Sequence, residues 1–421
     1  MIKKVLFISD HGDPLAKLGG EQAGGQNNYV RQLALALDKK GVKVDVVTHW
    51  SDADAPRIEK FGESCRVVRI AAGHKGFVSK NKMYELLPEF YREMKEALQL
   101  YSYDMVHTHY WLSGLIGKKL DKELNLPFIH TSHSLGIAKE RATGITDTRR
   151  QEAEIEIMRA AQIVLATTKS EKLLIGEIEP DSSPVKVIPI GVDKAFHIKA
   201  NRAAIRKEIG CTGPLLVYAG RLEETKGIYT LLRAYKQMVK RNGVPEGIQL
   251  IVAGGEPNAI DLKKGLPKED KLRKIVTGIE DKVRFVGPQS QEQLSNFFNA
   301  ATATIVPSYY ESFGMVAAEA QGCGSPVIAS NVGGLRNVVE DGVTGLLVEP
   351  KDEDDLSVAM EAIVSNDLLA QKLGKQASQK AAEEFQWPAI TAKVKGLYEE
   401  VLDARRDTLV GNGSGWNASW L

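Results

Sequence analysis

The chain has 421 residues, of which 43% are hydrophobic and 26% are charged. This length is too great for one hydrophobic core and predicts two domains of roughly 200 residues each. The 55 basic and 54 acidic residues leave a formal net charge of +1, so the chain has no overall attraction to nucleic acid or to a membrane surface. An anion would therefore have to be bound by a local group of residues.

The cysteines and the apolar runs indicate a cytoplasmic protein. Cys65, Cys211 and Cys323 are widely spaced and follow no metal-binding pattern, which is typical of free thiols in a reducing compartment. The opening MIKKVLFISDHGD places charged residues after a short apolar run, which predicts a first strand and not a signal peptide. No apolar run approaches the roughly 20 residues that a membrane-spanning helix needs.

Strands and helices alternate through the first half of the chain. The first apolar run is continuous, as expected for a parallel strand covered on both faces. A helix is predicted over 27–41, because Val30, Leu33 and Leu37 share one face and Gly41 ends the pattern. The predicted strands are Val5–Ile8, Val44–Thr48, Met105–His107, Pro127–Thr131 and Ile163–Thr167.

A second series of strands and helices follows a segment with a Pro and a Gly, Lys186–Asp193, which we interpret as a hinge. Two such series predict an α/β protein with two Rossmann-like, doubly wound domains that face a cleft. The predicted strands are Pro214–Ala219, Ile248–Ala253, Val283–Val286, Thr302–Val306, Pro326–Ala329 and Gly345–Val348.

The domain boundaries follow from these two series. We expect an N-terminal domain over 1–192 and a C-terminal domain over 193–386, with helical patterns from Glu353 to Phe385. A last helix is predicted over 387–406. The remaining residues, 407–421, are rich in Gly, Ser and Asn without periodicity, which predicts a disordered tail.

Two glutamates eight residues apart, Glu311 and Glu319, mark the most informative segment, PSYYESFGMVAAEAQ. The pattern predicts a strand, a short loop and a helix that begins near Ser312, with Glu319 two turns into it. Unpaired N–H groups at a helix start favour an anion, and a carboxylate on the helix can accept hydrogen bonds from ribose hydroxyls. This arrangement suits a nucleotide sugar.

Two further loops could contact a phosphorylated ligand. The loop from Gly19 to Asn27 joins the first strand to the first helix, and its glycines allow backbone amides to approach a phosphate. In the second series, YAGRLEETKG carries Arg221 and Lys226 just after a strand, where both could reach a diphosphate. Taken alone, each loop is also compatible with an ordinary solvated surface.

No metal site is expected from this sequence. His107, His109, His130 and His133 cluster at two strand ends, but no cysteine or spaced carboxylate completes a ligand set. Histidines at such places more often hydrogen-bond a ligand or the backbone. The D-x-D pattern at Asp52 lies in a polar loop and is common by chance.

Taken together, AGGQN, HTHYWLSG, HTSHSLG, AGRLEETKG and ESFGMVAAEAQ resemble the family 4 glycosyltransferases, whose members have the GT-B fold and retain the configuration of the transferred sugar. The resemblance runs from Val5 to about Leu402. Within the family, the chain most resembles members that act on inositol phosphate, and sucrose-phosphate synthases are similar as well. The resemblance implies a nucleotide sugar and a small phosphorylated acceptor as partners, and no cofactor or metal. A homodimer is possible.

The resemblance implies a donor site in the second domain and at the first helix. Gly25 is expected to give an amide to the donor diphosphate, which Arg221 and Lys226 neutralise as it leaves. Glu319 is expected to hold the ribose hydroxyls, and Glu311 the hydroxyls of the donor sugar. Amides from Phe313, Gly314, Met315 and Val316 assist Glu311.

The resemblance also implies an acceptor site in the first domain. His133 is expected to lie beneath the reacting sugar. The residues expected to hold the acceptor are His11, Asn27, Tyr110, Ser134, Arg150 and one of Lys80 and Lys82. The implied chemistry is front-face attack, in which the departing phosphate takes the proton of the acceptor.

Four functions remain open at this point. The first is transfer of a hexose or N-acetylhexosamine from a UDP-sugar to an acceptor of the inositol-phosphate type. The second is sucrose-phosphate synthesis from UDP-glucose and fructose 6-phosphate. The third is non-catalytic binding of a sugar nucleotide, which the intact set of charged residues opposes. The fourth is an epimerase or phosphorylase, because the fold does not determine the reaction.

Overall fold

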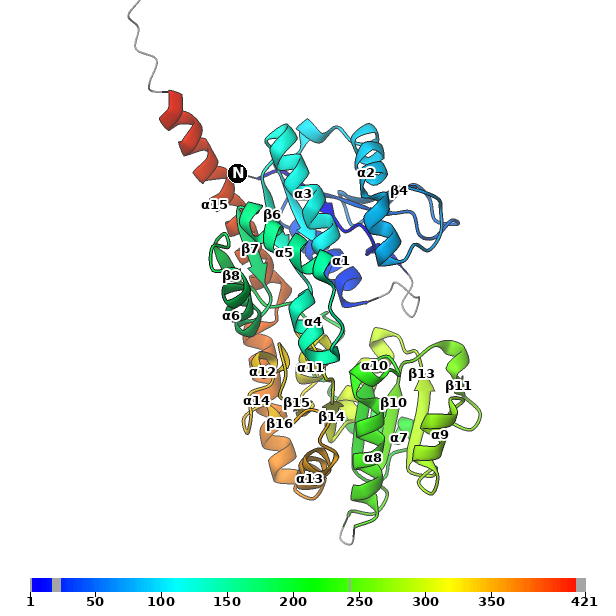
Figure 1. Cartoon of the computed structure of the whole chain (residues 1–421). Coiled ribbons are helices and arrows are strands. Elements are labelled where there is room, and N and C mark those ends of the chain that lie inside the picture. Colours follow the sequence, from blue (N-terminus) through cyan, green and yellow to red (C-terminus); the bar gives the residue numbers. More distant parts are fainter. Residues whose placement is uncertain (1, 17–23, 242–243, 414–421) are drawn as a thin grey trace, which may run out of the picture.

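A computed structural model describes residues 2–16, 24–241 and 244–413. It contains two α/β halves, one above the other, and two C-terminal helices, of which α14 (Asp367–Glu384) lies along the second half and α15 (Trp387–Gly413) along the first (Figure 1). The predicted fold class, two doubly wound domains, is confirmed.

The first half is built on an eight-stranded sheet with the order β3-β4-β2-β1-β5-β6-β7-β8. Its pairs are parallel except for the antiparallel edge pair of β3 and β4. The strands are β1 (Lys4–Ile8), β2 (Lys43–His49), β3 (Ile58–Phe61), β4 (Cys65–Ile70), β5 (Met105–His109), β6 (Phe128–Thr131), β7 (Ile163–Ala166) and β8 (Val185–Val187).

Helices cover both faces of this sheet because successive strand residues point to opposite sides. Val5 and Phe7 belong to a core with α1, whereas Leu6 and Ile8 belong to another with α2, α3 and α5. The helices are α1 (Gly25–Asp38), α2 (Lys80–Ala97), η1 (Leu100–Ser102), α3 (Trp111–Leu124), α4 (Gly136–Thr143), α5 (Thr148–Ala160) and α6 (Lys169–Ile178).

The second half contains a six-stranded parallel sheet with the order β13-β10-β9-β14-β15-β16. Its strands are β9 (Leu215–Ala219), β10 (Gln249–Ala253), β13 (Val283–Gly287), β14 (Ala303–Val306), β15 (Val327–Ser330) and β16 (Gly345–Val348). A small antiparallel pair, β11 (Ile260–Asp261) and β12 (Leu266–Pro267), lies apart from this sheet.

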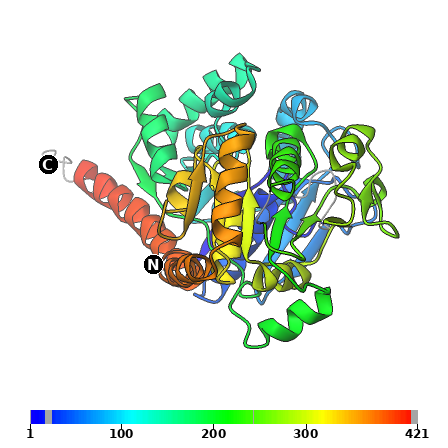
Figure 2. The same cartoon turned by 90° about the horizontal axis from the view of Figure 1, so that it is seen from below.

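Two layers of helices enclose the second sheet (Figure 2). One core joins it to α8, α9 and α13, and another joins it to α7, α10 and α11. The helices are α7 (Arg202–Ile209), η2 (Glu224–Lys226), α8 (Ile228–Val239), η3 (Pro257–Ala259), α9 (Asp270–Val276), α10 (Gln291–Ala300), α11 (Met315–Gly322), α12 (Leu335–Val338), α13 (Glu353–Val364) and α14 (Asp367–Glu384).

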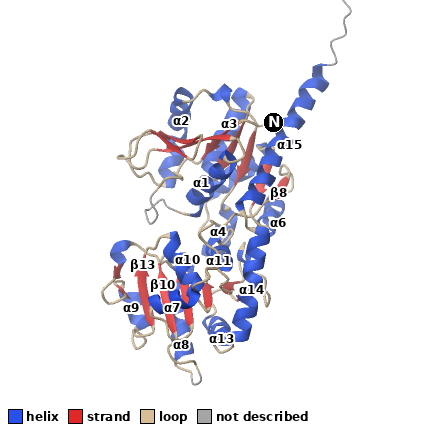
Figure 3. Cartoon of the chain, turned by 180° about the vertical axis from the view of Figure 1, so that it is seen from behind, coloured by secondary structure: helices blue, strands red, loops and turns tan. Residues whose placement is uncertain are grey.

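The last helix, α15 (Trp387–Gly413), leaves the second half and returns to the first, as Figure 3 shows from behind. It packs against α1 through the core that contains Ile390 and Val394. The hydroxyl of Tyr398 lies 2.7 Å from Nδ1 of His107 in β5. The helix includes 407–413, which we expected in the tail; 414–421 lie outside the described residues.

The sequence patterns missed three strands of the first half, β3, β4 and β8. The edge strand β3 is the least regular, since only Phe61 of its four residues is buried. The expected start of α11 at Ser312 is also wrong. The helix begins at Met315, because Gly314 takes a left-handed conformation with φ of 102°, so Glu319 lies about one turn into the helix.

A buried ion pair anchors the loop that follows β1. Nε of Arg69, in β4, lies 2.6 Å from Oδ2 of Asp13, and the side chain of Arg69 is only 2% exposed. Glu59 in β3 also pairs with Arg69, at 2.8 Å. Asp13 in turn accepts a hydrogen bond on its backbone oxygen from Asn27 at 2.8 Å. The loop after β1 is therefore held to the edge of the sheet.

Replacing Arg69 by Met should lower the free energy of unfolding by roughly 3–5 kcal/mol, because it leaves the carboxylate of Asp13 buried without its partner. Urea unfolding of the purified variant measures this change. Glu156→Gln is a suitable control, because its pair with Lys118 is solvent-exposed and should contribute little. A loss below about 1 kcal/mol for the Met variant would contradict the anchoring role of the pair.

Candidate active site in the cleft

The predicted site residues gather at the carboxyl ends of the two central strands, β1 and β9. In the first sheet, β1 lies between β2 and β5, and in the second sheet β9 lies between β10 and β14. Ligands of open α/β sheets bind where the chain leaves such neighbouring strands in opposite directions. His11 follows β1 and Tyr110 follows the neighbouring β5, whereas Arg221 and Lys226 follow β9 and Glu311 follows the neighbouring β14.

Lys226 and Glu311 form an ion pair at the second of these positions. Nζ of Lys226 lies 2.6 Å from Oε1 of Glu311, and both side chains are partly exposed. Ser308 donates a hydrogen bond to the same oxygen at 3.1 Å. The two loops are also joined through the backbone, where Tyr309 N–H donates to the Thr225 oxygen at 2.9 Å. The pair is thus held in place at the cleft.

Arg221 is the most exposed of the predicted donor residues. Its side chain is 73% exposed and pairs with Glu223 at 2.9 Å. It also lies close enough to Lys80, in the other half of the chain, to lower the pKa of that lysine slightly. Arg221 therefore lies on the part of the second half that is near Lys80 of the first half.

A pair of glycines that the sequence reasoning overlooked shapes the Glu311 loop. The N–H of Gly334 donates to the backbone oxygen of Glu311 at 2.9 Å. A Cβ on Gly333 would lie 2.3 Å from that oxygen, and one on Gly334 would lie 2.2 Å from the oxygen of Ser312. Only glycine permits so close an approach. The signal in the sequence is the Gly-Gly that follows strand β15 by a few residues.

The starts of two helices from different halves meet at the cleft. Gly25 begins α1 and Met315 begins α11, and a Cβ on Gly25 would lie 3.8 Å from Cγ of Met315. Each helix start presents unpaired N–H groups and a partial positive charge. Phe313 is buried against Phe385, which holds the loop before α11 in place. The two helix starts together favour an anion between the halves.

Glu319 is buried on α11, and this burial changes its acidity. Desolvation, and to a smaller extent the charge of Asp193, raises the pKa of Glu319 to about 8. Asp193 itself accepts a hydrogen bond from Gln32 of α1 at 2.5 Å. The carboxyl group that is expected to hold ribose hydroxyls is therefore protonated at neutral pH when the cleft is empty.

Several predicted acceptor residues lie around the ring of Tyr110. Nζ of Lys80 lies 4.6 Å from the ring centroid, Cζ of Arg150 lies 4.9 Å from it, and the ring of His11 lies 4.6 Å from it. Arg150 also donates to the hydroxyl of Ser134 at 2.9 Å and pairs with the buried Glu154 at 2.7 Å. These residues therefore form one cluster, which we call the basic cluster: His11, Lys80, Tyr110, Ser134 and Arg150.

Lys80 is the lysine of this cluster, and Lys82 is not. Desolvation, and then the charge of Arg150, lowers the pKa of Lys80 to about 8, although the residue as a whole remains exposed. Lys82 is exposed on α2, about 200° around the helix from Lys80. Asn27 is buried, and its amide nitrogen already donates to the backbone of Asp13.

The predicted histidine cluster lies beneath the cleft, where His107, His109 and His130 are buried and His133 is partly exposed. Nδ1 of His109 lies 3.0 Å from Nε2 of His133, and the rings of His107 and His109 are 4.2 Å apart. Burial lowers the pKa of His107 and of His130 to about 3 and the pKa of His133 well below its usual value, so these imidazoles are neutral. His133 is also in the left-handed region, with φ of 59°.

Neither metal binding nor membrane spanning has support among the described residues. They contain no group of three or more histidine, cysteine, aspartate or glutamate side chains placed to hold a metal ion. Asp52 accepts a hydrogen bond from the backbone of Asp54 in an exposed loop. Of the helices described, none is long and apolar enough to cross a membrane.

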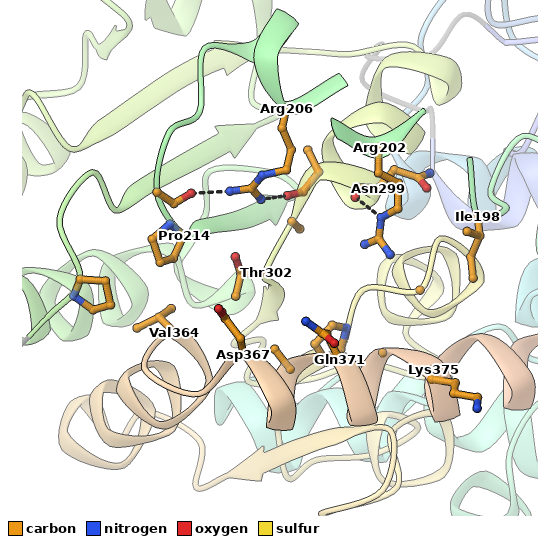
Figure 4. A pocket seen from close by; sticks show the side chains of 18 of the residues that line it. Ile198, Arg202, Arg206, Pro214, Asn299, Thr302, Val364, Asp367, Gln371 and Lys375 are labelled. Atoms are coloured by element: carbon orange, nitrogen blue, oxygen red, sulfur yellow. Dashed lines mark hydrogen bonds between the residues drawn. The ribbon is translucent and has the colours of Figure 1, made fainter. Parts of the chain in front are cut away.

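A large cavity of about 800 Å³ lies away from these residues, at the amino ends of the second sheet (Figure 4). Its two arginines already serve a structural purpose. Arg202 donates to the backbone oxygen of Asn299, and Arg206 donates to that of Ala300, at the end of α10. Cations at the C-terminal end of a helix satisfy its last carbonyls. We therefore place the functional site in the cleft and not in this cavity.

Comparison with known proteins identifies the family of this chain. Residues 23–196 match the family described as Glycosyltransferase Family 4, and residues 201–380 match Glycosyl transferases group 1. A D-inositol 3-phosphate glycosyltransferase of Nocardia farcinica is 32% identical over 424 residues, covering 98% of this chain and 92% of the relative. One of Nocardioides sp. is 34% identical over 416 residues, covering 94% and 90%.

This chain is a family 4 glycosyltransferase with the GT-B fold. The structure of a sucrose-phosphate synthase from Thermosynechococcus elongatus matches it with a TM-score of 0.84 and 34% identity, covering 96% of this chain and 100% of that one. Anabaena HepE, in complex with UDP and glucose, shares the fold with a TM-score of 0.72 and 19% identity over 94% of this chain and 100% of its own. The relatives of this glycosyltransferase thus include D-inositol 3-phosphate glycosyltransferases and a sucrose-phosphate synthase.

The raised pKa of Glu319 predicts how nucleotide binding by the glycosyltransferase depends on pH. A carboxylate accepts hydrogen bonds from ribose hydroxyls better than a carboxylic acid does, so affinity should rise as Glu319 ionises. With a pKa of about 8, the Kd for UDP should fall about tenfold between roughly pH 7 and pH 9 and then level off. Isothermal titration calorimetry across this range measures the change.

Glu319→Gln is the matched variant for this titration, since it removes the ionisable group and keeps the side-chain shape. Its Kd for UDP should be nearly independent of pH. An equal pH dependence in both proteins would show that another group is responsible. Because the folded-state pKa is raised from 4.5 to about 8, the unfolded chain loses this proton first, and stability falls as pH rises from 4.5 to about 8. Binding is therefore compared only where both proteins remain folded.

Proposed function

We propose that this glycosyltransferase moves a hexose or N-acetylhexosamine from a UDP-sugar to a small phosphorylated polyol or sugar, with retention of configuration. The observation that carries this proposal is the proximity of the basic cluster at Tyr110 to the charged loops of the second half: Arg221 influences the pKa of Lys80, and Arg150 influences the pKa of Tyr310, which precedes Glu311 of the Lys226–Glu311 pair. A cleft with cationic groups on both walls suits two anionic substrates, a nucleoside diphosphate sugar and a phosphate ester.

The second half supplies the donor side of the proposal. Arg221 and Lys226 follow β9, and the starts of α1 and α11 add partial positive charge near Met315. A diphosphate bound among these groups would be neutralised as it leaves. Glu311 is already paired with Lys226, so its remaining oxygen can accept a hydrogen bond from a sugar hydroxyl. The HepE structure, with UDP and glucose, is consistent with this reading.

The first half supplies the acceptor side. Lys80 and Arg150 are 70 positions apart in the chain, but both contact the ring of Tyr110. Ser134, which is hydrogen-bonded to Arg150, adds a hydroxyl group. Arginine binds phosphate through two parallel hydrogen bonds, and lysine binds it as a compact charge. The relatives that act on inositol 3-phosphate support an acceptor of this class.

The proposed chemistry is substitution on one face of the donor sugar. The bond from the anomeric carbon to the diphosphate oxygen breaks, and its electron pair stays with the diphosphate. The acceptor oxygen attacks the same face while its proton passes to the departing phosphate. His133, neutral and strained beneath the cleft, would hydrogen-bond the sugar. The charge on the leaving group is balanced by Arg221 and Lys226 in this proposal, without a metal ion.

Sucrose-phosphate synthesis is the second candidate, because the sucrose-phosphate synthase structure is 34% identical to this chain and matches it closely. It would use the same donor wall and the same phosphate contacts, with fructose 6-phosphate in place of an inositol phosphate. The two candidates therefore differ in the acceptor and in whether the donor sugar is glucose alone.

A panel of donors and acceptors, tested without added metal, separates these possibilities. The donors are UDP-N-acetylglucosamine, UDP-glucose, GDP-mannose and ADP-glucose. The acceptors are inositol 3-phosphate, fructose 6-phosphate and glucose 6-phosphate, each with its unphosphorylated form. Turnover that requires the phosphate supports the proposal, and the best pair identifies the substrates. Turnover with unphosphorylated acceptors alone would refute the acceptor assignment.

Replacing Arg221 or Lys226 by Ala should lower kcat by a factor of roughly 10²–10³, because each removes a charge that stabilises the departing diphosphate. Steady-state kinetics with the best substrate pair measures this. Arg233→Ala is a control from the same half, since Arg233 pairs with Glu353 on the surface. Full turnover by both site variants would remove Arg221 and Lys226 from the mechanism.

A further inference from the structure

Asp10 is a buried carboxylate in the cleft to which the donor and acceptor assignments give no role. It follows β1 directly and is 0% exposed. The hydroxyl of Ser113 donates to Oδ1 of Asp10 at 2.5 Å and accepts from the backbone N–H of Asp10 at 3.0 Å. The other carboxylate oxygen, Oδ2, lies 3.1 Å from Nδ1 of His11. This contact is an ion pair only when His11 is protonated.

This contact determines which nitrogen of His11 carries the proton. An ionised carboxylate only accepts hydrogen bonds, and a neutral imidazole has one donor nitrogen and one acceptor nitrogen. With Oδ2 of Asp10 opposite Nδ1, the neutral His11 must carry its proton on Nδ1. The other nitrogen, Nε2, then has a lone pair and is able to accept a hydrogen bond. The same logic applies where a carboxylate orients the base of a catalytic triad.

The surroundings of His11 indicate what Nε2 would meet. The imidazole packs edge-on against the ring of Tyr110, and the same ring is approached by Lys80 and Arg150. Asp10 also lies close enough to Lys80 to influence its pKa. His11 is therefore part of the group that is proposed to hold the phosphorylated acceptor, and a polyol phosphate bound there would bring hydroxyl groups to it.

We propose that Asp10 is a positioning residue that holds His11 in the Nδ1–H form, so that Nε2 accepts a hydrogen bond from a hydroxyl of the acceptor. This inference rests on the proposed function. It divides acceptor recognition into two parts. Lys80 and Arg150 bind the phosphate, and the Asp10–His11 pair selects a correctly placed hydroxyl. The class of acceptor is then a phosphate ester that carries a free hydroxyl within reach of His11.

A purely structural pair is the competing explanation, since Asp10 also accepts hydrogen bonds from the strand and the loop around it. His49 N–H, for example, donates to the backbone oxygen of Asp10 at 2.7 Å. A structural role would affect folding but not the position of a proton on His11 or the affinity for one substrate. The experiments below therefore measure these two quantities.

The first measurement is the tautomer of His11. Protein labelled with ¹⁵N-histidine is studied by long-range ¹H–¹⁵N NMR at about pH 8.5, where an ordinary imidazole is neutral, and His11→Gln assigns the signal. The wild type should show the proton on Nδ1. In Asp10→Asn the amide can donate to Nδ1, so the proton should move to Nε2. A wild-type His11 with its proton on Nε2 would overturn the proposal whichever substrates the enzyme uses.

The second measurement is steady-state kinetics with the best acceptor of the panel. Asp10→Asn should raise the KM for the acceptor about tenfold, the magnitude of one lost hydrogen bond. The release of UDP from the donor without acceptor should stay unchanged. His11→Gln can place an amide oxygen near the position of Nε2 and should raise the KM only a few-fold, whereas His11→Asn cannot reach it and should match Asp10→Asn.

Asp45→Asn is the matched control. Asp45, in β2, is also a buried carboxylate, but it is hydrogen-bonded to Arg66 and Tyr103 and is not among the predicted site residues. It should lower stability without changing the KM for the acceptor. An acceptor KM that rises equally in both Asn variants, or in neither, would overturn the proposal. If no acceptor of the panel reacts, the proposed function fails, and the NMR result alone decides the role of Asp10.

Discussion

Parallel strand pairing is the constraint on which this structure depends. Parallel strands need a crossover connection between them. As a result, the carboxyl ends of the parallel strands all lie at the same edge of their sheet. Both sheets obey this rule, with β1 and β9 at their centres. Chemistry-bearing residues from distant parts of the chain, such as His11 and Tyr110, therefore meet at one edge. The cleft forms where the edges of the two sheets face each other.

Glycine makes the close approaches in this cleft possible. Gly314 takes a left-handed conformation and so delays the start of α11 until Met315. Gly333 and Gly334 lie against the backbone of the Glu311 loop, where a Cβ would collide with backbone oxygens. Gly227, next to Lys226, lies similarly close to the backbone oxygen of Pro307, with which a Cβ would collide. These residues allow the backbone of the second half to form a compact cradle with its amides available to an anion.

Two kinds of ionisable group in the cleft have separate effects, exposed groups that carry charge and buried groups that are neutral. Arg221 and Lys226 are accessible cations that can neutralise a departing diphosphate. Glu319, His107, His109 and His130 are buried, and desolvation keeps them neutral at pH 7. The buried groups therefore contribute hydrogen bonds and shape instead of net charge. Because Asp10 is buried as well, its contact with His11 can determine a tautomer, which an exposed carboxylate would do less reliably.

The amino-acid sequence by itself determined the two α/β series, because continuous apolar runs such as Val5–Ile8 are diagnostic of covered parallel strands. It also determined the family, through Glu311, Glu319 and the Arg221–Lys226 loop. Only the tertiary structure decided that Lys80 and not Lys82 joins Arg150, since that choice depends on how α2 is rotated against Tyr110. The same holds for the start of α11, for the contact of Tyr398 with His107, and for the pairing of Asp10 with His11. These features depend on contacts between elements remote in the chain, on a single backbone angle or, for the adjacent residues Asp10 and His11, on side-chain conformation, and local sequence patterns carry no information about any of these.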